Sequence, residues 1–349
     1  MIPTKKRRQG ARTATIIAAL ALGFSGAPAA AEDFYKDKTV RMIISSTVGG
    51  GYDVYARALA RYLPRHLPGN PVIEPQNMPN AGGISAANYL YTIAPKDGTV
   101  FAALQNTVPF EPFYENKLAL FDPDKFGWLG TPTTEVAMYL VYGSSKIRSL
   151  KDAQTLPMVA GAAGAASTPA FYGRVFNDIF HLKAKLVNGY PGQNEILLAM
   201  ESGEVEAMPS PFWSSLKTSR PDWYPQGKVR FLFQYGARPH SELAGVPFAP
   251  DLLDKPDDKT LLIAASAPLG IGRPYAAPPG LPPERLAMLK KGFMETVRDP
   301  DFIAECGKQR IECTDSHDGE EVAALIRQAY ATPPAIRQRL IAIQAAGAP

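Results

Sequence analysis

The sequence contains few of the residues that build metal or redox sites. Two cysteines and four histidines occur in 349 residues, and the histidines are scattered along the chain. Only His317 lies near the cysteines, so we expect no metal site. Cys306 and Cys313 are seven residues apart. In an oxidising compartment they form either a disulfide that closes a small loop or a pair of buried thiols, and the sequence favours neither interpretation.

A basic surface is also lacking once the N-terminus is set aside. The formal net charge of the whole chain is +4, from 37 Lys and Arg against 33 Asp and Glu. Residues 1–31 hold five of the basic residues and no acidic one, which leaves 32 basic against 33 acidic residues after position 31. No basic stripe remains, so we expect no nucleic-acid partner.

The first 31 residues predict a secretory signal peptide. Residues 5–8 are basic, residues 15–24 are largely apolar, and three alanines occupy positions 29–31. The apolar run is too short to span a membrane permanently, and no later segment has the required length. We therefore expect a periplasmic protein whose mature chain begins near Glu32.

Motifs for phosphate binding and nucleophilic catalysis are absent. The sequence contains no GxGxxG, GxxxxGK[ST] or GxSxG pattern. This disfavours nucleotide ligands and a serine hydrolase. We expect no catalytic residue and no cofactor.

The sequence does contain a strand followed by a triple glycine and a helix. Residues 40–44 are mostly apolar, Gly49, Gly50 and Gly51 follow, and a helix is expected to open around Asp53. A helix N-terminus is electropositive, and glycine lets a ligand approach the backbone closely, so the pattern is typical of an anion site. A purely structural turn is the alternative interpretation.

Four loops of this kind occur, at residues 47–53, 77–85, 161–168 and 188–194. Each is expected to follow a strand and to begin a helix, with two loops in each half of the fold, facing one cleft. None contains Lys or Arg, which favours a carboxylate held by backbone amides, hydroxyls and water. Asp53 is predicted to cap amides two or three residues further on, leaving the amides of the triple glycine to the ligand.

The candidate ligand-binding residues lie in these loops and after the strand expected at 99–104. They are Thr47, Gly49, Gly50, Gly51, Tyr52, Asn77, Ala81, Gly82, Gly83, Gln105, Asn106, Gly164, Ala166, Ser167, Thr168, Tyr190, Pro191, Gly192 and Asn194. Tyr52 and Tyr190, together with Phe212 and Trp213, are predicted to form aromatic walls for an apolar ligand body. Core packing is an equally good interpretation for Phe212 and Trp213.

Several segments together resemble a known family. They are VRMIISSTVGGGYD, NMPNAGGISAANYL, APKDGTV, GAAGAASTP, NGYPGQNEILLAMESGEVEA and YAAPPGLPPERLAMLKKGFMETVRDPDF, and they extend over essentially the whole chain after residue 31. Their order and spacing are similar to those of the tripartite tricarboxylate transporter receptors, the Bug family of periplasmic solute-binding proteins.

The resemblance implies an α/β, two-lobe periplasmic binding protein of type II-like architecture. Each lobe would be a mixed sheet flanked by helices, with a ligand cleft between the lobes. A monomer would bind a small carboxylate solute without chemical change and deliver it to the integral-membrane permease subunits of a tripartite tricarboxylate-type transporter. A periplasmic sensor signalling to a membrane regulator is an alternative function, and an exported hydrolase is a weaker one.

The expected organisation is an insertion of the second lobe into the first. Residues 32–135 are expected to begin lobe 1, residues 136–234 to form lobe 2, and residues 235–349 to return to lobe 1. The segment 239–283 is rich in Pro and Gly. We expect it to be a surface connection, with helices resuming at about 282.

Overall fold

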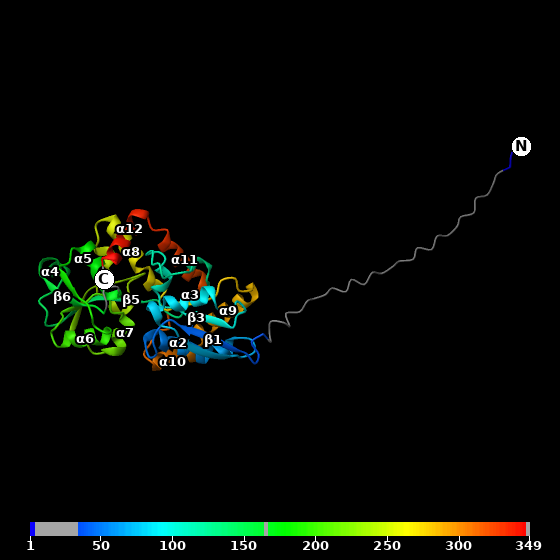
Figure 1. The fold of residues 1–349 in the computed structure, drawn as a ribbon, viewed down its shortest axis with the longest axis horizontal. Coiled ribbons are helices and arrows are strands. Elements are labelled where there is room, and N and C mark those ends of the chain that lie inside the picture. Colours follow the sequence, from blue (N-terminus) through cyan, green and yellow to red (C-terminus); the bar gives the residue numbers. More distant parts are fainter. Residues whose placement is uncertain (4–33, 164–166, 347–349) are drawn as a thin grey trace.

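The computed structural model describes residues 1–3, 34–163 and 167–346. The predicted signal peptide lies outside the described residues except for its first three positions. Figure 1 shows two groups of strands, each flanked by helices, which confirms the predicted α/β class with two mixed sheets.

The first sheet has six strands in the order β11-β4-β10-β3-β1-β2. Its strands are β1 (Thr39–Ile44), β2 (Val72–Asn77), β3 (Val100–Ala103), β4 (Gly127–Thr131), β10 (Tyr275–Ala277) and β11 (His317–Asp318). β1 pairs in parallel with β2 and β3, whereas β10 and β11 join antiparallel. Val40, Met42 and Ile44 of β1 are fully buried, as the apolar run predicts. β1 is therefore an interior strand of the sheet, between β2 and β3, and the triple-glycine loop follows its carboxyl end.

The second sheet has five strands in the order β7-β6-β8-β5-β9. These are β5 (Val136–Tyr142), β6 (Met158–Gly161), β7 (Ala184–Val187), β8 (Ala207–Met208) and β9 (Val229–Gly236). β6 runs parallel to β7 and β8, and β5 is antiparallel to β8 and β9. The carboxyl ends of β6 and β7 consequently carry the loops 161–168 and 188–194 on one edge of this sheet.

Helices cover both sheets. They are α2 (Gly51–Tyr62), α3 (Ile84–Thr92), α4 (Leu150–Thr155), α5 (Thr168–Phe180), α6 (Gln193–Glu201), α7 (Trp213–Ser219), α8 (Pro256–Gly270), α9 (Pro283–Arg298), α10 (Pro300–Lys308), α11 (Gly319–Tyr330) and α12 (Pro334–Ala345). In the described part of the chain, no helix has both the length and the apolar character needed to cross a lipid bilayer.

Two crossovers connect the sheets, and they touch each other. One runs from β4 to β5, and the other from α8 to β10. The Glu135 N–H donates to the Leu269 carbonyl across them at 2.8 Å. Gly272 has a φ of +46°, and a Cβ there would lie 1.9 Å from the Thr133 carbonyl oxygen. Only glycine permits this close approach, so Gly272 holds the crossovers together.

The expectation of a surface connection over 239–283 is wrong in its central part, because α8 occupies residues 256–270. Leu261, Leu262 and Ala265 are fully buried in this helix. Pro256 is the first helical residue, a position that suits proline, whereas Pro268 lies inside the last turn, where it removes one helical hydrogen bond without ending the helix. From Leu261 to Ala267 the sequence is apolar apart from Ser266, which is consistent with the burial of this part of the helix.

The C-terminal helix α12 packs against α5 and α8. Arg339 places one Nη 2.6 Å from Asp178 of α5 and the other 2.6 Å from Asp258 of α8. The Nε of Arg174 donates to the Ile343 carbonyl at 2.8 Å. The final helix of the chain thus contacts a helix that flanks the second sheet.

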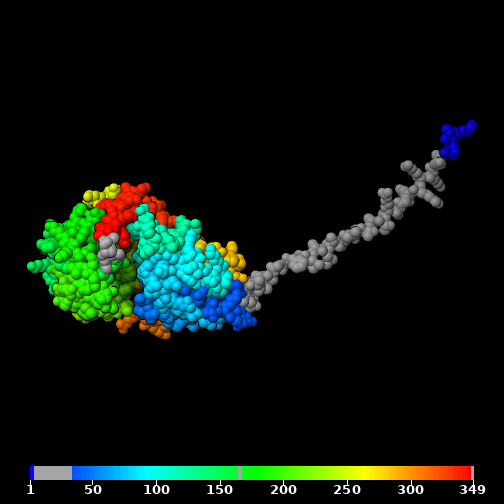
Figure 2. All heavy atoms as spheres, viewed as in Figure 1, coloured from blue at the N-terminus to red at the C-terminus, as the bar shows by residue number. Residues whose placement is uncertain are grey.

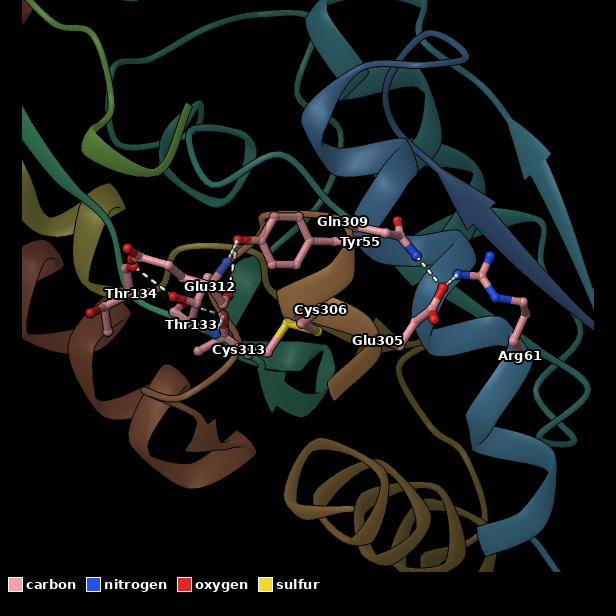
Figure 3. Close-up of a disulfide and its surroundings, with 10 residues drawn as sticks. Tyr55, Arg61, Thr133, Thr134, Glu305, Cys306, Gln309, Glu312 and Cys313 are labelled. Carbon is pink, nitrogen blue, oxygen red and sulfur yellow. Dashed lines mark hydrogen bonds and ion pairs between the residues drawn. A yellow bond between two sulfur atoms is a disulfide. The ribbon is translucent and has the colours of Figure 1, made fainter. Parts of the chain in front are cut away.

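Cys306 and Cys313 form a disulfide (Figure 3), which decides between the two interpretations of the sequence. Both cysteines are 2% exposed. The bond closes the loop between α10 and β11. That loop reaches the space between the two sheets.

Candidate functional site

A cavity of about 590 Å³ lies between the two halves of the molecule. Figure 2 shows the groove between the green half and the blue and cyan half. The lining residues are Thr47, Gly49, Gly50, Gly51, Val54, Tyr55, Gly192, Gln193, Asn194, Glu195, Ser214, Ser215, Thr218, Ser219, Arg273, Gln309 and Ile311. We call this space the main cavity. Its volume falls in the usual range for small-molecule sites.

A small cavity of about 200 Å³ adjoins it and shares Gln193 with it. The other lining residues are Ala163, Thr168, Pro169, Ile196, Met208, Ser210 and Phe212. Most of these side chains are apolar. A ligand extending from the main cavity into the small cavity would therefore move from polar to apolar surroundings.

The N-terminus of α2 opens onto the main cavity. Gly50 is its N-cap and carries no capping side chain. The first helical hydrogen bond runs from the Val54 N–H to the Gly50 carbonyl, at 3.0 Å. The N–H groups of Gly51, Tyr52 and Asp53 precede that bond and have no acceptor within the helix. This end of α2 has the arrangement expected for binding an anion.

The predicted role of Asp53 is wrong in its direction. Its carboxylate does not cap amides further along the helix but accepts the Gly49 N–H at 2.8 Å. The Gly49 amide is therefore already bonded, and the Gly50 amide donates to the Thr47 carbonyl at 3.3 Å. The amides left to a ligand are those of Gly51, Tyr52 and Asp53, two residues further on than the sequence suggested.

Asp53 is the buried centre of a partly exposed network behind the loop. It also accepts from Arg57 Nε at 2.9 Å and from Asn77 Nδ2 at 2.8 Å. Asn77 in turn accepts from Arg57 and donates to the Ser46 carbonyl. Burial opposes the charged carboxylate, but these hydrogen bonds outweigh it, so the pKa of Asp53 is lowered. Asn77, proposed as a ligand contact, has its amide engaged in holding the loop.

The N-terminus of α6 faces the same cavity from the other half. Gly192 is its N-cap, again without a capping side chain, and Ile196 makes the first helical bond at 3.3 Å. Asn194 and Glu195 are exposed and line the main cavity. Two helix N-termini, one from each half, thus converge on one space, as the loop pattern predicts.

The third loop, 161–168, reaches the small cavity through Ala163 and Thr168. Gly164 and Ala166 lie outside the described residues. Ser167 is the N-cap of α5, yet its hydroxyl makes no capping bond and has no partner within the described chain. Thr168 also lines a further pocket of about 70 Å³ with Thr107 and Phe171.

The second loop is not brought to these cavities. Asn77, Ala81, Gly82 and Gly83 do not line them. The Gln105 amide binds the Ser45 carbonyl at 2.6 Å and the Gly82 carbonyl at 3.1 Å. This fastens the loop to the end of β1, away from the main cavity.

Of the aromatic and amide residues proposed as ligand contacts, some line a cavity and others only make hydrogen bonds within the protein. Phe212 lines the small cavity, whereas Trp213 is buried and donates to Glu242 at 2.6 Å. The Tyr52 hydroxyl donates to the side-chain oxygen of Asn106 and accepts the backbone N–H of Asn106. Neither residue lines the main or the small cavity.

Tyr190, on the other half, donates to Glu204 at 2.6 Å. Burial and this carboxylate raise the pKa of Tyr190 to about 12. Neither Tyr190 nor Pro191 lines the three cavities. Their loop instead leads into Gly192, which does.

Sequence reasoning missed one wall of the main cavity. Ser214, Ser215, Thr218 and Ser219 of α7 line it, at positions i, i+1, i+4 and i+5. That spacing puts four small hydroxyl side chains on one helical face, a signal that was visible in the sequence. The facing residues, Gln309 and Ile311, belong to the disulfide loop, which no local motif marks.

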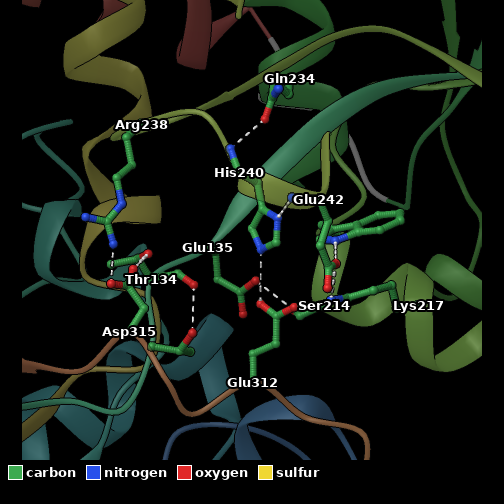
Figure 4. A network of polar contacts seen from close by, with 12 residues as sticks. Thr134, Glu135, Ser214, Lys217, Gln234, Arg238, His240, Glu242, Glu312 and Asp315 are labelled. Atoms are coloured by element: carbon green, nitrogen blue, oxygen red, sulfur yellow. Dashed lines mark hydrogen bonds and ion pairs between the residues drawn. The ribbon is translucent and has the colours of Figure 1, made fainter. Parts of the chain in front are cut away.

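The disulfide loop is bonded to α7 across the space between the halves. Thr218 donates to the Arg310 carbonyl at 2.8 Å, and Lys217 forms an ion pair with Glu312. The Tyr55 hydroxyl donates to the Glu312 carbonyl and accepts the Glu312 backbone N–H, both at 2.9 Å (Figure 3). Figure 4 shows Lys217 also reaching Glu242. This wall is therefore a cross-linked unit.

Arg273 is a second lining feature that the sequence did not predict. Among the described residues, it is the one cation in the lining of the main cavity. It is 4% exposed and its Nη2 donates to Glu135, 2% exposed, at 2.7 Å. Ser214 donates to the second carboxylate oxygen at 2.8 Å (Figure 4). Burial opposes the charged guanidinium, but Glu135 outweighs it and raises the pKa of Arg273, so the arginine stays charged. Arg273 lies in a crossover, far in sequence from every glycine loop.

No protein-family model matches the chain. Two relatives are similar along most of its length. The UPF0065 protein in gbd 5'region of Cupriavidus necator is 25% identical over 327 residues, covering 88% of this chain and 90% of that protein. A second UPF0065 protein, from Bordetella bronchiseptica, is 24% identical over 314 residues, covering 86% of each.

Solved periplasmic binding proteins share the fold. A TctC solute binding protein from Polaromonas has a TM-score of 0.68 at 19% identity, with 87% of this chain and 98% of that chain covered. The periplasmic binding protein BugD gives 0.63 at 17%, covering 88% and 98%. MatC from Rhodopseudomonas palustris, solved with bound malate, gives 0.61 at 17% with the same coverage. The resemblance drawn from the sequence motifs is thereby confirmed, and the fold is that of these binding proteins.

Proposed function

We propose that this protein is a periplasmic solute-binding receptor that captures a small carboxylate-bearing metabolite between its two halves. The observation that carries the proposal is the convergence of the α2 and α6 N-termini on the main cavity. Free amides at a helix N-terminus bind carboxylates without a dedicated cation. The malate in MatC, a protein of the same fold, supports a carboxylate as the ligand class.

The proposal includes a division into lobes and a closing motion. Residues 32–135 and 235–349 would form lobe 1 around the first sheet, and residues 136–234 lobe 2. The touching crossovers at Glu135 and Gly272 would act as the hinge. Binding would bring the α6 N-terminus towards that of α2, as in other two-lobe binding proteins.

Transport is the proposed use of the bound state. A monomer exported by residues 1–31, with its mature chain starting near Glu32, would deliver the solute to the permease subunits of a tripartite tricarboxylate-type transporter. N-terminal sequencing of the exported protein tests the export step, because a chain still beginning at Met1 contradicts it. A sensor would use the same closing cleft, and the permease is what separates the two functions. Uptake of the solute by cells with and without the permease tests this.

Binding without chemistry fits the lining better than hydrolysis does. Within the described chain, the main cavity lining includes Ser214, Ser215 and Ser219 but no histidine. Ser214 donates a hydrogen bond to Glu135, which is itself paired with Arg273, so this serine lacks the histidine base of a Ser-His-Asp hydrolase. Recovery of the bound solute unchanged after incubation is the expected result, and a new product would contradict it.

The experiment that tests the proposed function is a thermal-shift screen of the mature protein against carboxylates. A ligand that binds only the folded state raises the Tm. At 100 times its Kd, such a ligand stabilises by about 2.7 kcal/mol. Small-angle scattering with the best ligand should then show a smaller radius of gyration. The absence of any shift across carboxylates would contradict the proposal.

A further inference from the structure

The described linings of the two cavities contain few charged side chains, which limits the charge of the ligand that they can bind. Counting described residues, their linings contain one cationic side chain, Arg273, and one acidic side chain, Glu195. Arg273 is itself paired with the buried Glu135. Desolvated carboxylates without a partner are costly, so the site offers a favourable place for one carboxylate rather than for two or three.

Arg273 is held beside the free amides of α2. A Cβ built on Gly51 would lie 3.5 Å from both Nη1 and Nη2 of the guanidinium, so the backbone of Gly51 and the arginine face each other. Its Cζ lies 4.3 Å from the centre of the Tyr52 ring and 5.0 Å from that of Tyr55. Two rings and one carboxylate thus fix a buried cation at the floor of the main cavity.

The hydrogen bonds of Arg273 leave donor capacity for a ligand. Its backbone N–H goes to Thr131 Oγ1 at 3.0 Å, and Nη2 goes to Glu135. The Nε is buried and has no partner in the described chain. A guanidinium has five N–H donors in a planar fork, and both Nη atoms of Arg273 face Gly51.

The small cavity begins at Phe212, whose ring centre is 5.7 Å from the guanidinium carbon. Pro169, Ile196 and Met208 extend the apolar lining from there. A ligand with its carboxylate at Arg273 would place its other end in this apolar space. There a second carboxylate would lose its hydration without gaining a cation.

We propose that the ligand is an amphipathic monocarboxylate, with its carboxylate bound jointly by Arg273 and the first-turn amides of α2 and its apolar body in the small cavity. This inference rests on the proposed function and deepens it. Arg273 is then a specificity-determining contact, and Glu135 positions it.

The first test compares ligands on the unmodified mature protein by calorimetry. The probes are phenylacetate, its neutral analogue phenylacetamide, the dicarboxylates malate and adipate, and the tricarboxylate citrate. We expect phenylacetate to bind at least tenfold more tightly than each of the others. Tighter binding of malate, adipate or citrate would overturn the inference while leaving a carboxylate receptor in place. Failure of every carboxylate to bind would instead overturn the proposed function.

The second test isolates the arginine. Arg273→Gln alone would leave Glu135 buried without its partner. The test therefore compares the double variant Glu135→Gln/Arg273→Gln with the single variant Glu135→Gln. Both variants lack the buried carboxylate, and they differ only at Arg273. The measured quantity is the preference for phenylacetate over phenylacetamide. We expect that preference to fall at least tenfold in the double variant relative to the single one. An equal preference in both would overturn the role of Arg273, and if the double variant does not fold, the ligand comparison still decides the ligand class.

Discussion

The N-termini of α2 and α6 have the same local plan and different surroundings. Each has a glycine N-cap without a side-chain cap and an acidic residue at the third helical position, Asp53 or Glu195. Asp53 is 2% exposed, paired with Arg57 and bonded to Gly49. Glu195 is exposed and lines the main cavity.

The difference shows how one chain can make one helix end receptive to an anion and leave the other less so. The negative charge of Asp53 is turned away from the cavity and balanced by a cation, so the α2 dipole and amides remain available. Glu195 faces the cavity, where its charge opposes an incoming carboxylate. We therefore assign the anion to α2 and the neutral part of the ligand to α6.

The largest expected effect comes from obstructing the α2 end. Gly50 has an extended backbone conformation that other residues adopt, so Gly50→Val should fold. The valine side chain would obstruct access of a ligand to the first-turn amides of α2. Loss of one hydrogen bond to a carboxylate, worth about 1.5–3 kcal/mol, should weaken binding roughly 10- to 150-fold.

Calorimetry with a ligand from the carboxylate screen measures this loss. Gly245→Val is the matched control, because a Cβ at the exposed Gly245 meets nothing within 4 Å and the residue lies outside the cavity lining. Equal affinity in both variants would show that the α2 end does not hold the anion.

The disulfide loop provides the next effect, on stability. Replacing Cys306 and Cys313 together by serine should lower the free energy of unfolding by about 2–3 kcal/mol, because the unfolded chain regains the freedom of the closed loop. Denaturant unfolding under oxidising conditions measures it. The unmodified protein with its disulfide reduced should show a similar loss. An unchanged midpoint would mean that the contacts of Arg310 and Glu312 with α7 hold the loop without the bond.

A smaller effect concerns Asp53 and pH. Because its pKa is lowered from the ordinary value of 3.8, its contribution to stability is present above about pH 4 and is lost as pH falls through the lower folded-state pKa. Asp53→Asn should cost about 1–3 kcal/mol at neutral pH and flatten the acid limb of the stability profile. Glu195→Gln is the matched control at the same helical position, with an expected change within about 0.5 kcal/mol. An acid limb that is identical in Asp53→Asn and the unmodified protein would contradict the network.

The smallest effect should appear in binding at α6. Glu195→Gln removes a like charge from the cavity wall and should tighten carboxylate binding by about 1.4-fold to fivefold, in keeping with exposed charge interactions of about 0.2–1 kcal/mol. The gain should shrink at high salt. Weaker binding on this substitution would show that Glu195 contacts the ligand favourably, so that the two helix ends do not differ in the way described.

The loops were predictable because their signals are local. A strand end, a glycine and a helix start lie next to one another in sequence, and three of the four loops do reach the main or the small cavity. The second loop does not, because the side-chain amide of Gln105, 23 residues beyond Gly82, fastens it to the end of β1. No local pattern reveals a tie between two separate segments.

Arg273 and α8 were missed for related reasons. Arg273 comes to the site through a crossover whose position depends on both sheets, so nothing near it in sequence marks it as a contact. In α8 the prolines at 256 and 268 have the local appearance of irregular chain, and burial of the apolar residues between them overrides that appearance. Both depend on the tertiary fold rather than on nearest neighbours in the chain.

The most direct test of carboxylate capture at α2 is a crystal structure of the mature protein with the tightest-binding carboxylate from the screen. We predict the carboxylate within hydrogen-bond distance of the Gly51 and Tyr52 amides and of Arg273, with the rest of the ligand towards Phe212. A ligand bound elsewhere would contradict this placement, for example in the groove of about 460 Å³ lined by Phe248, Ile263 and Leu325 beside α8 and α11.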